Sequence, residues 1–168
     1  TFDYLLDMTQ PDFSPTGDRV AAVRMAWGNP SDFRFEGGEI VSIPFSGGVL
    51  GDPVLIVPTD NTHNFYYPAW SPDGEWLAYN RTIGAAYASP AAEIFLTDKD
   101  GSQHIRLDTA NGEGELQNSY TRWGPLPDDD VLWLAYSSKR SYPADFGSSP
   151  QIWVTAIDTE KAAAGEDP

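Results

Sequence analysis

The sequence of 168 residues contains no cysteine. This absence excludes disulfides, thiolate metal sites, cysteine nucleophiles and cysteine-linked haem. Basic residues are also scarce, since ten Lys and Arg stand against 25 Asp and Glu and give a formal net charge of -15. Lys and Arg bind nucleic-acid phosphates and anionic lipid headgroups, so this charge argues against nucleic acid or a membrane surface as a partner. Long apolar runs are missing as well, and we expect no segment to insert into a membrane.

Residue types that build catalytic and metal sites are few or badly spaced. A histidine-based metal site needs its ligands together, but the only histidines, His63 and His104, stand at different positions of the repeating unit described below, on a link between units and on an outer strand. Ser71 does not lie in the Gly-x-Ser-x-Gly pattern of a nucleophile turn. Segment 98–102 begins like a calcium loop, but Leu107 stands where a bidentate Glu is required, which favours a hairpin turn. We therefore expect no catalytic residue, no metal site and no cofactor.

The sequence does contain a pattern that occurs three times. Residues 67–79 combine aromatic-rich flanks with a tight Ser-Pro-Asp-Gly turn, which is typical of a β-hairpin. Weaker copies occupy residues 11–23 and 123–136. The aromatic residues of the three copies, at positions 13, 70 and 123, are 57 and 53 residues apart. A second set of residues repeats at a similar spacing, because isoleucines at positions 40, 94 and 152 are 54 and 58 residues apart.

A period of this length that contains only strand-like segments indicates the blades of a β-propeller. The predicted fold is an all-β propeller of four-stranded antiparallel blades, and about three such blades can be recognised in the sequence. The chain is expected to be one partial propeller, residues 1–168, with blade 1 at about 7–58, blade 2 at about 64–108 and blade 3 at about 118–158. Blade 3 lacks an outer strand, and residues 159–168 are expected to be a tail or linker. The structural positions of the repeat are Phe13, Pro15, Gly17, Trp70, Pro72, Asp73, Gly74 and Trp123.

The motif Pro-x-(Trp/Phe)-Ser-Pro-x-Gly-x-x-(Val/Leu)-Ala, complete at residues 68–78, is followed by a strand at 93–98 and a turn at 100–102. This arrangement resembles the TolB-like, or PD40 (WD40-like), β-propeller repeat, and the likeness covers about residues 7–158. It implies a larger ring of six to eight blades. Further blades would come from the same polypeptide or from a second copy of the chain. The resemblance also implies a periplasmic or secreted location.

Two functions follow from this resemblance. The first is a non-catalytic module that binds a protein or peptide partner, as a scaffold within a larger extracytoplasmic protein or complex. The second is the substrate-gating propeller of a prolyl-oligopeptidase-like or tricorn-like peptidase, whose catalytic domain is absent from this sequence. An α/β-hydrolase portion in the full-length gene would decide for the second, and a signal peptide with only further repeats would decide for the first.

The expected binding surface is the face of the propeller that carries the long loops, because function concentrates on loops held by a rigid scaffold. The opposite face carries tight turns. Aromatic and Arg side chains dominate interface hot spots. The candidate binding residues on the loop-rich face are therefore Trp27, Phe33, Arg34, Phe35, Tyr87, Arg140, Tyr142, Asp145 and Phe146. The alternative is that these side chains cap the ends of the blades.

Overall fold

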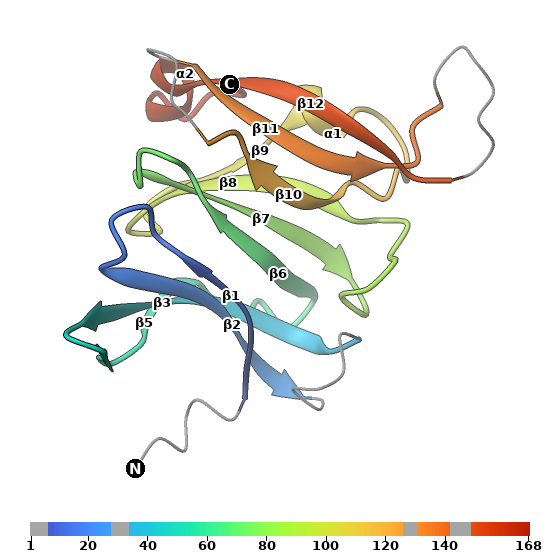
Figure 1. The fold of residues 1–168 in the computed structure, drawn as a ribbon. Coiled ribbons are helices and arrows are strands. Elements are labelled where there is room, and N and C mark those ends of the chain that lie inside the picture. Colours follow the sequence, from blue (N-terminus) through green and yellow to red (C-terminus); the bar gives the residue numbers. More distant parts are fainter. Residues whose placement is uncertain (1–6, 28–33, 126–130, 142–148) are drawn as a thin grey trace.

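The computed structural model describes residues 7–27, 34–125, 131–141 and 149–168. These residues form three antiparallel sheets stacked side by side, with the second sheet between the other two (Figure 1). In the second and third sheets the strands follow one another in chain order, which is the meander of a propeller blade, and the first sheet departs from this order only at its last strand. The predicted all-β fold of partial propeller blades is confirmed.

The strands of each sheet come from one continuous stretch of the chain. The first sheet contains β1 (Met8–Phe13), β2 (Arg19–Trp27), β3 (Glu36–Ser46), the short β4 (Val49–Leu50) and β5 (Val54–Val57), which pairs with β3. The second contains β6 (His63–Trp70), β7 (Trp76–Ile83), β8 (Glu93–Asp98) and β9 (His104–Arg106). The third contains β10 (Ser119–Trp123), β11 (Val131–Ser138) and β12 (Gln151–Asp158).

The predicted hairpin turns close the first two strands of blades 1 and 2 in the same way. The amide of Gly74 donates to the carbonyl of Ser71 at 3.0 Å, and the amide of Gly17 donates to that of Ser14 at 2.9 Å. Ser71 is fully buried, and its hydroxyl accepts the amide of Trp76 at 2.9 Å. Its role is therefore structural, as the sequence predicts.

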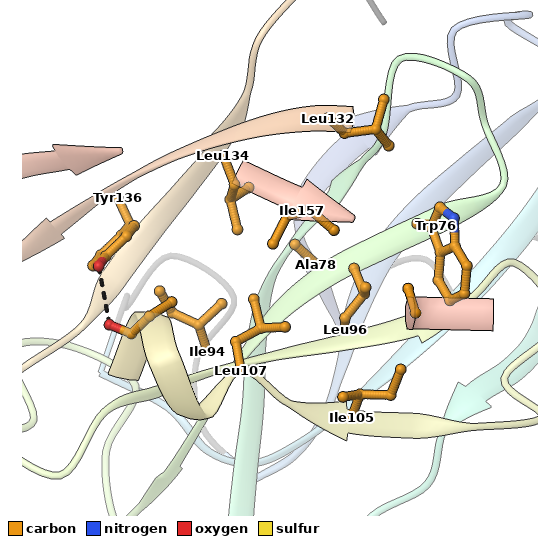
Figure 2. Close-up of a cluster of buried hydrophobic side chains, with 12 residues drawn as sticks. Trp76, Ala78, Ile94, Leu96, Ile105, Leu107, Leu132, Leu134, Tyr136 and Ile157 are labelled. Atoms are coloured by element: carbon orange, nitrogen blue, oxygen red, sulfur yellow. Dashed lines mark hydrogen bonds between the residues drawn. The ribbon is translucent and has the colours of Figure 1, made fainter. Parts of the chain in front are cut away.

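The main apolar clusters lie between neighbouring sheets, and a smaller one, with Ala22, Val41 and Ile43, lies on the first sheet alone. The cluster between the first two sheets is rich in aromatic residues, with Phe65, Trp70, Tyr79 and Phe95. The cluster between the second and third sheets is mainly aliphatic, with Leu96, Leu132, Leu134 and Ile157 among its members (Figure 2). Figure 2 also shows the Tyr136 hydroxyl, which donates to the Ala110 carbonyl at 2.9 Å.

Two short helices accompany the sheets. The first, α1 (Asp108–Asn111), follows β9 and was not expected from the sequence. The second, α2 (Thr159–Ala163), begins where the Asp158 carboxylate accepts two amides of the first helical turn. Ala162 is fully buried, and its carbonyl accepts the Gln103 side chain at 3.1 Å. The expected tail or linker is thus packed against the second sheet. None of the helices in the described parts of the chain is long and apolar enough to cross a membrane.

Candidate functional site

The structure describes five of the nine residues proposed for the loop-rich face. Phe33, Tyr142, Asp145 and Phe146 lie outside the described residues. Trp27 ends β2, where its backbone pairs with Glu36 of β3. The surroundings of Arg34, Phe35, Tyr87 and Arg140 are considered in turn below.

Phe35 is not available to a partner, and this prediction is corrected. Its side chain is only 1% exposed and packs in a cluster with Val23, Met25 and Tyr66. The backbone is fixed from two other elements, because the Phe35 carbonyl accepts the side chain of Asn64 at 2.8 Å and the amide of Ala86 at 3.0 Å. These bonds turn the ring inward, so Phe35 caps the end of the blades.

Arg140 links helix α1 to the third sheet. Its guanidinium donates to the Ala110 carbonyl at 2.5 Å and lies 4.9 Å from the centre of the Trp153 ring. Its own amide donates to the Ser138 hydroxyl at 3.1 Å. The side chain is half-buried, and through these contacts Arg140 bridges helix α1 and the third sheet in a structural role.

Arg34 and Tyr87 do form an exposed pair at the loop-rich face. The Arg34 guanidinium lies 5.7 Å from the centre of the Tyr87 ring, a cation–π arrangement. Arg34 is exposed, and 40% of Tyr87 is accessible to solvent. This pair retains the features expected of a binding surface.

Two tyrosines from the first strands of blades 2 and 3 extend this surface. The rings of Tyr67 (β6) and Tyr120 (β10) lie 4.6 Å apart, centre to centre. Burial, the hydrogen bond with Tyr120 and the neighbouring Tyr66 and Tyr87 all raise the pKa of Tyr67. Tyr120 is 43% exposed. We name Tyr67, Tyr87 and Tyr120 together the tyrosine platform.

The backbone of the platform is held in an unusual conformation. Tyr67 and Tyr120 have positive φ angles of 49° and 57°, and each lies where a bulge shifts the strand register. Gln10, at the equivalent place in β1, has a φ of 52°. Such angles cost on the order of 1 kcal/mol or more in a non-glycine residue and collect at functional sites. Ala88 and Gln117, with φ angles of 54° and 51°, lie close in sequence to the platform.

Contacts beneath and beside the platform hold it rigidly. Tyr67 packs on the buried cluster that contains Phe35 and Tyr66, with the Tyr66 and Tyr67 ring centres 5.1 Å apart. The amide of Tyr67 donates to the Gln10 side chain at 2.7 Å, which joins blade 2 to blade 1. A rigid aromatic surface loses little conformational entropy when a ligand binds. The arrangement can therefore support binding of apolar or planar groups.

Sequence reasoning missed Tyr67 and Tyr120 as binding residues. A signal was present, because they are separated by the same 53 residues as Trp70 and Trp123. The repeat assigned Tyr67 to a strand of the hairpin, but it gave no sign of the positive φ that displaces the side chain from the regular alternation of a strand.

Among the described residues, no three His, Asp or Glu side chains group together in a way that could hold a metal ion. The His63 ring nitrogen lies 2.5 Å from Asp60, and that of His104 lies 3.2 Å from the Tyr79 hydroxyl. Segment 98–102 is the predicted hairpin turn, since the Gly101 amide donates to the Asp98 carbonyl at 3.1 Å.

Comparison with known proteins supports the fold and leaves the activity open. No family model matches the chain, and no curated protein matches it. Among solved structures, a TolB-like protein from Agrobacterium tumefaciens superposes with a TM-score of 0.55 at 17% identity, over 88% of this chain and 45% of that one. A prolyl endopeptidase superposes with a TM-score of 0.53 at 14% identity, over 93% of this chain and 21% of that one. The chain thus spans less than half of each, and the likeness is one of fold.

Proposed function

We propose that this chain is a non-catalytic β-propeller module that binds a protein or peptide partner as part of a larger extracytoplasmic protein or complex. The tyrosine platform with Arg34 carries the proposal, because it combines exposed aromatic rings, a cation and a rigid support. The fold shared with a TolB-like protein supports the periplasmic or secreted location.

The platform favours a particular kind of partner. Its rings present flat apolar faces with polar hydroxyls at their edges, which suits an extended peptide segment with apolar or planar side chains. The formal net charge of -15 repels strongly acidic partners and increases the rate at which basic ones approach. We therefore propose a neutral or basic peptide segment as the partner.

A peptide-display experiment tests this proposal. Random twelve-residue peptides on phage are selected against the protein, and the affinities of the selected peptides are measured by fluorescence anisotropy. The double variant Tyr87→Ser with Tyr120→Ser should weaken binding by about tenfold or more, as expected for loss of two aromatic hot spots. Val49→Ser is the matched control, since Val49 is an exposed apolar residue of the β4 turn outside the platform. Equal peptide affinities of the wild type, the double variant and Val49→Ser would show that the platform is not part of the binding surface.

We also propose that further blades, from the same polypeptide or a second copy, cover two open sheet faces. The free face of the first sheet has an apolar hollow of about 370 Å³, lined by side chains that include Val20, Ile43 and Phe45. On the third sheet, Trp133, Ile152 and Val154 are exposed. Exposed apolar faces of this kind mark contact surfaces. The inter-sheet clusters among the described residues show what packs against such faces elsewhere in the chain.

The alternative function is the propeller domain of a peptidase, which the fold shared with a prolyl endopeptidase favours. In that case a catalytic domain accompanies the propeller in the full-length polypeptide. Labelling of the full-length polypeptide with a fluorophosphonate probe separates the two functions. A labelled serine would support the peptidase, and an unlabelled polypeptide that still binds the selected peptides would support the non-catalytic module.

A further inference from the structure

A second hollow lies at the tight-turn end of the first strands of all three blades, away from the loop-rich face. Its volume is about 290 Å³. The walls repeat from blade to blade and consist of the aromatic residues Phe13, Trp70 and Trp123 and the prolines Pro15, Pro72 and Pro125. These six residues occupy the same places in the three copies of the repeat. They build the scaffold of the hollow.

One position in the hollow departs from the repeat. Directly before each aromatic residue stand Asp12 in blade 1, Ala69 in blade 2 and Arg122 in blade 3, and all three line the hollow. A blade needs no charge at this place, as Ala69 demonstrates. An acid and a base therefore flank a small residue at this position.

Asp12 retains hydrogen-bonding capacity toward the hollow. The side chain is half-buried, and its Oδ2 accepts the amide of Trp70 at 2.7 Å. Burial raises the pKa of Asp12, while the Trp70 bond and the positive charge of Arg122 oppose the rise. A carboxylate in this setting gains from a further hydrogen-bond donor, because partial burial has removed part of its hydration.

Arg122 interacts electrostatically with Asp12 but, in the part of the chain that the structure describes, makes no close contact with a carboxylate. Its guanidinium donates to the carbonyl of Thr121 at 2.9 Å, and among the described residues it forms no ion pair. The side chain is exposed at the hollow. In contrast, Arg24, Arg81 and Arg106 each lie against a glutamate. Arg122 is thus positioned to bind an acceptor from outside the chain.

We propose that this hollow binds a short dipolar peptide segment that bridges Asp12 and Arg122. The Asp12 carboxylate accepts from an amine or N–H group at one end of the ligand. The Arg122 guanidinium donates to a carboxylate or carbonyl at the other end. Apolar side chains of the ligand pack against the prolines and aromatic rings of the wall. The site neutralises both ends of the ligand, so the net charge of the chain does not oppose binding.

Four forms of one dipeptide, alanyl-leucine, test the site by isothermal titration calorimetry. The forms are the free zwitterion, the N-acetylated peptide, the C-terminal amide and the doubly blocked peptide. Asp12→Asn should lose the preference for a free amine, and Arg122→Gln should lose the preference for a free carboxylate. Each variant should bind the zwitterion about tenfold more weakly, the effect expected for loss of a charge-assisted hydrogen bond.

The controls separate this site from the tyrosine platform and from general charge effects. Lys99→Gln removes an exposed cation outside the hollow and should leave all affinities unchanged. The double variant Tyr87→Ser with Tyr120→Ser should also bind the zwitterion normally, so failure at either site is distinguishable. Equal binding of the doubly blocked and free forms, reduced by both variants, would support the site and identify an internal peptide segment as its ligand. Absence of binding by every form, or affinities unchanged in both variants, would overturn the proposal.

Discussion

Phe13, Trp70 and Trp123 occupy one position of the repeat but have different surroundings. Trp70 is 5% exposed between the first two sheets, whereas Phe13 is 57% exposed on the free face of the first sheet. Trp123 is half-buried and donates its indole N–H to the Ala69 carbonyl of the preceding blade at 2.9 Å. The aromatic residue of each blade therefore contacts the blade before it, and its energetic contribution depends on whether that blade is present.

Alanine substitutions at this position should differ in cost. Trp70→Ala is expected to lower the free energy of unfolding by roughly 3 to 5 kcal/mol, because it removes a buried aromatic side chain. Phe13→Ala should cost less than about 1 kcal/mol, since most of the ring is already in water. Urea denaturation of the 168-residue chain measures both. A comparable loss for Phe13→Ala would show that another blade covers this ring.

Asp60 provides a test of pH dependence. Partial burial raises its pKa, but hydrogen bonds from His63 and Thr62 outweigh this effect and lower the pKa to about 2 from its ordinary value of 3.8. A lowered folded-state pKa stabilises the protein above pH 3.8, and this contribution is lost as the pH falls through about 2.

Asp60→Asn should therefore destabilise the protein at pH 7 by about 1 kcal/mol or less, the range of exposed pairs. The difference from wild type should shrink as the pH falls from 4 to 2, as measured by urea denaturation at each pH. Asp52→Asn is the control at another acidic loop residue. A difference that stays constant over this pH range would contradict the assigned pKa.

At the scale of elements, the hairpin turns join neighbouring blades as well as neighbouring strands. Gly74 and Gly101 both have φ angles near +75°, at 75° and 72°. A Cβ atom on Gly101 would lie 2.4 Å from the Ile56 carbonyl oxygen of the first sheet, whereas one on Gly74 would lie 3.3 Å from the edge of the Pro15 ring. The turn of Gly101 thus contacts a rigid strand of the adjacent blade.

Gly101→Ala should cost clearly more stability than Gly74→Ala. Both substitutions carry the positive-φ penalty of roughly 1 kcal/mol or more. Only Gly101→Ala also forces two backbones apart, which should add a loss visible as a lower melting temperature. Thermal unfolding followed by circular dichroism compares the two variants directly. If Gly74→Ala lowers the melting temperature more than Gly101→Ala does, the close contact between Gly101 and Ile56 does not determine the cost of the substitution.

The strands and turns could be predicted from the sequence because their causes are local. Proline, aspartate and glycine specify the turns, and the repeat fixes where each strand lies. The sequence could not decide between binding and capping for Phe35, because its burial depends on Asn64 and Ala86, which come from other elements. The tyrosine platform was missed because the sequence repeat does not mark the bulges of β6 and β10 at which Tyr67 and Tyr120 have positive φ.

At the scale of the whole molecule, the stack of sheets has an open apolar face at each end. The first sheet exposes Phe13 beside its hollow, and the third exposes Trp133, Ile152 and Val154. The edge of β12 is also unpaired within the described residues. Faces and edges of this kind promote association, because they offer both apolar area and free backbone groups.

The isolated chain should therefore associate in a concentration-dependent way in sedimentation velocity experiments. The double variant Ile152→Lys with Val154→Lys should shift the chain toward monomer without loss of β-sheet circular dichroism, because both side chains already lie in water. Ile83→Lys is the control at an equally exposed site on the second sheet. A compact wild-type monomer at all concentrations would contradict the proposal that further blades cover these faces, and a stable dimer would favour a second copy.

The two inter-sheet clusters described above differ in chemistry, and this difference specifies the order of the blades. The side of blade 2 that faces blade 1 carries three aromatic rings, with ring centres of Phe65 and Tyr79 6.0 Å apart and those of Tyr79 and Phe95 5.7 Å apart. These rings pack against the smaller side chains Ala21, Ile40, Ile56 and Val57 of blade 1. Branched aliphatic side chains join blades 2 and 3. With blades 1 and 3 exchanged, the rings of blade 2 would meet Leu132, Leu134 and Tyr136 in place of the smaller Ala21 and Val57, and the resulting overlap would be costly. Each junction therefore identifies its correct neighbour, so the repeats share one architecture without being interchangeable during assembly.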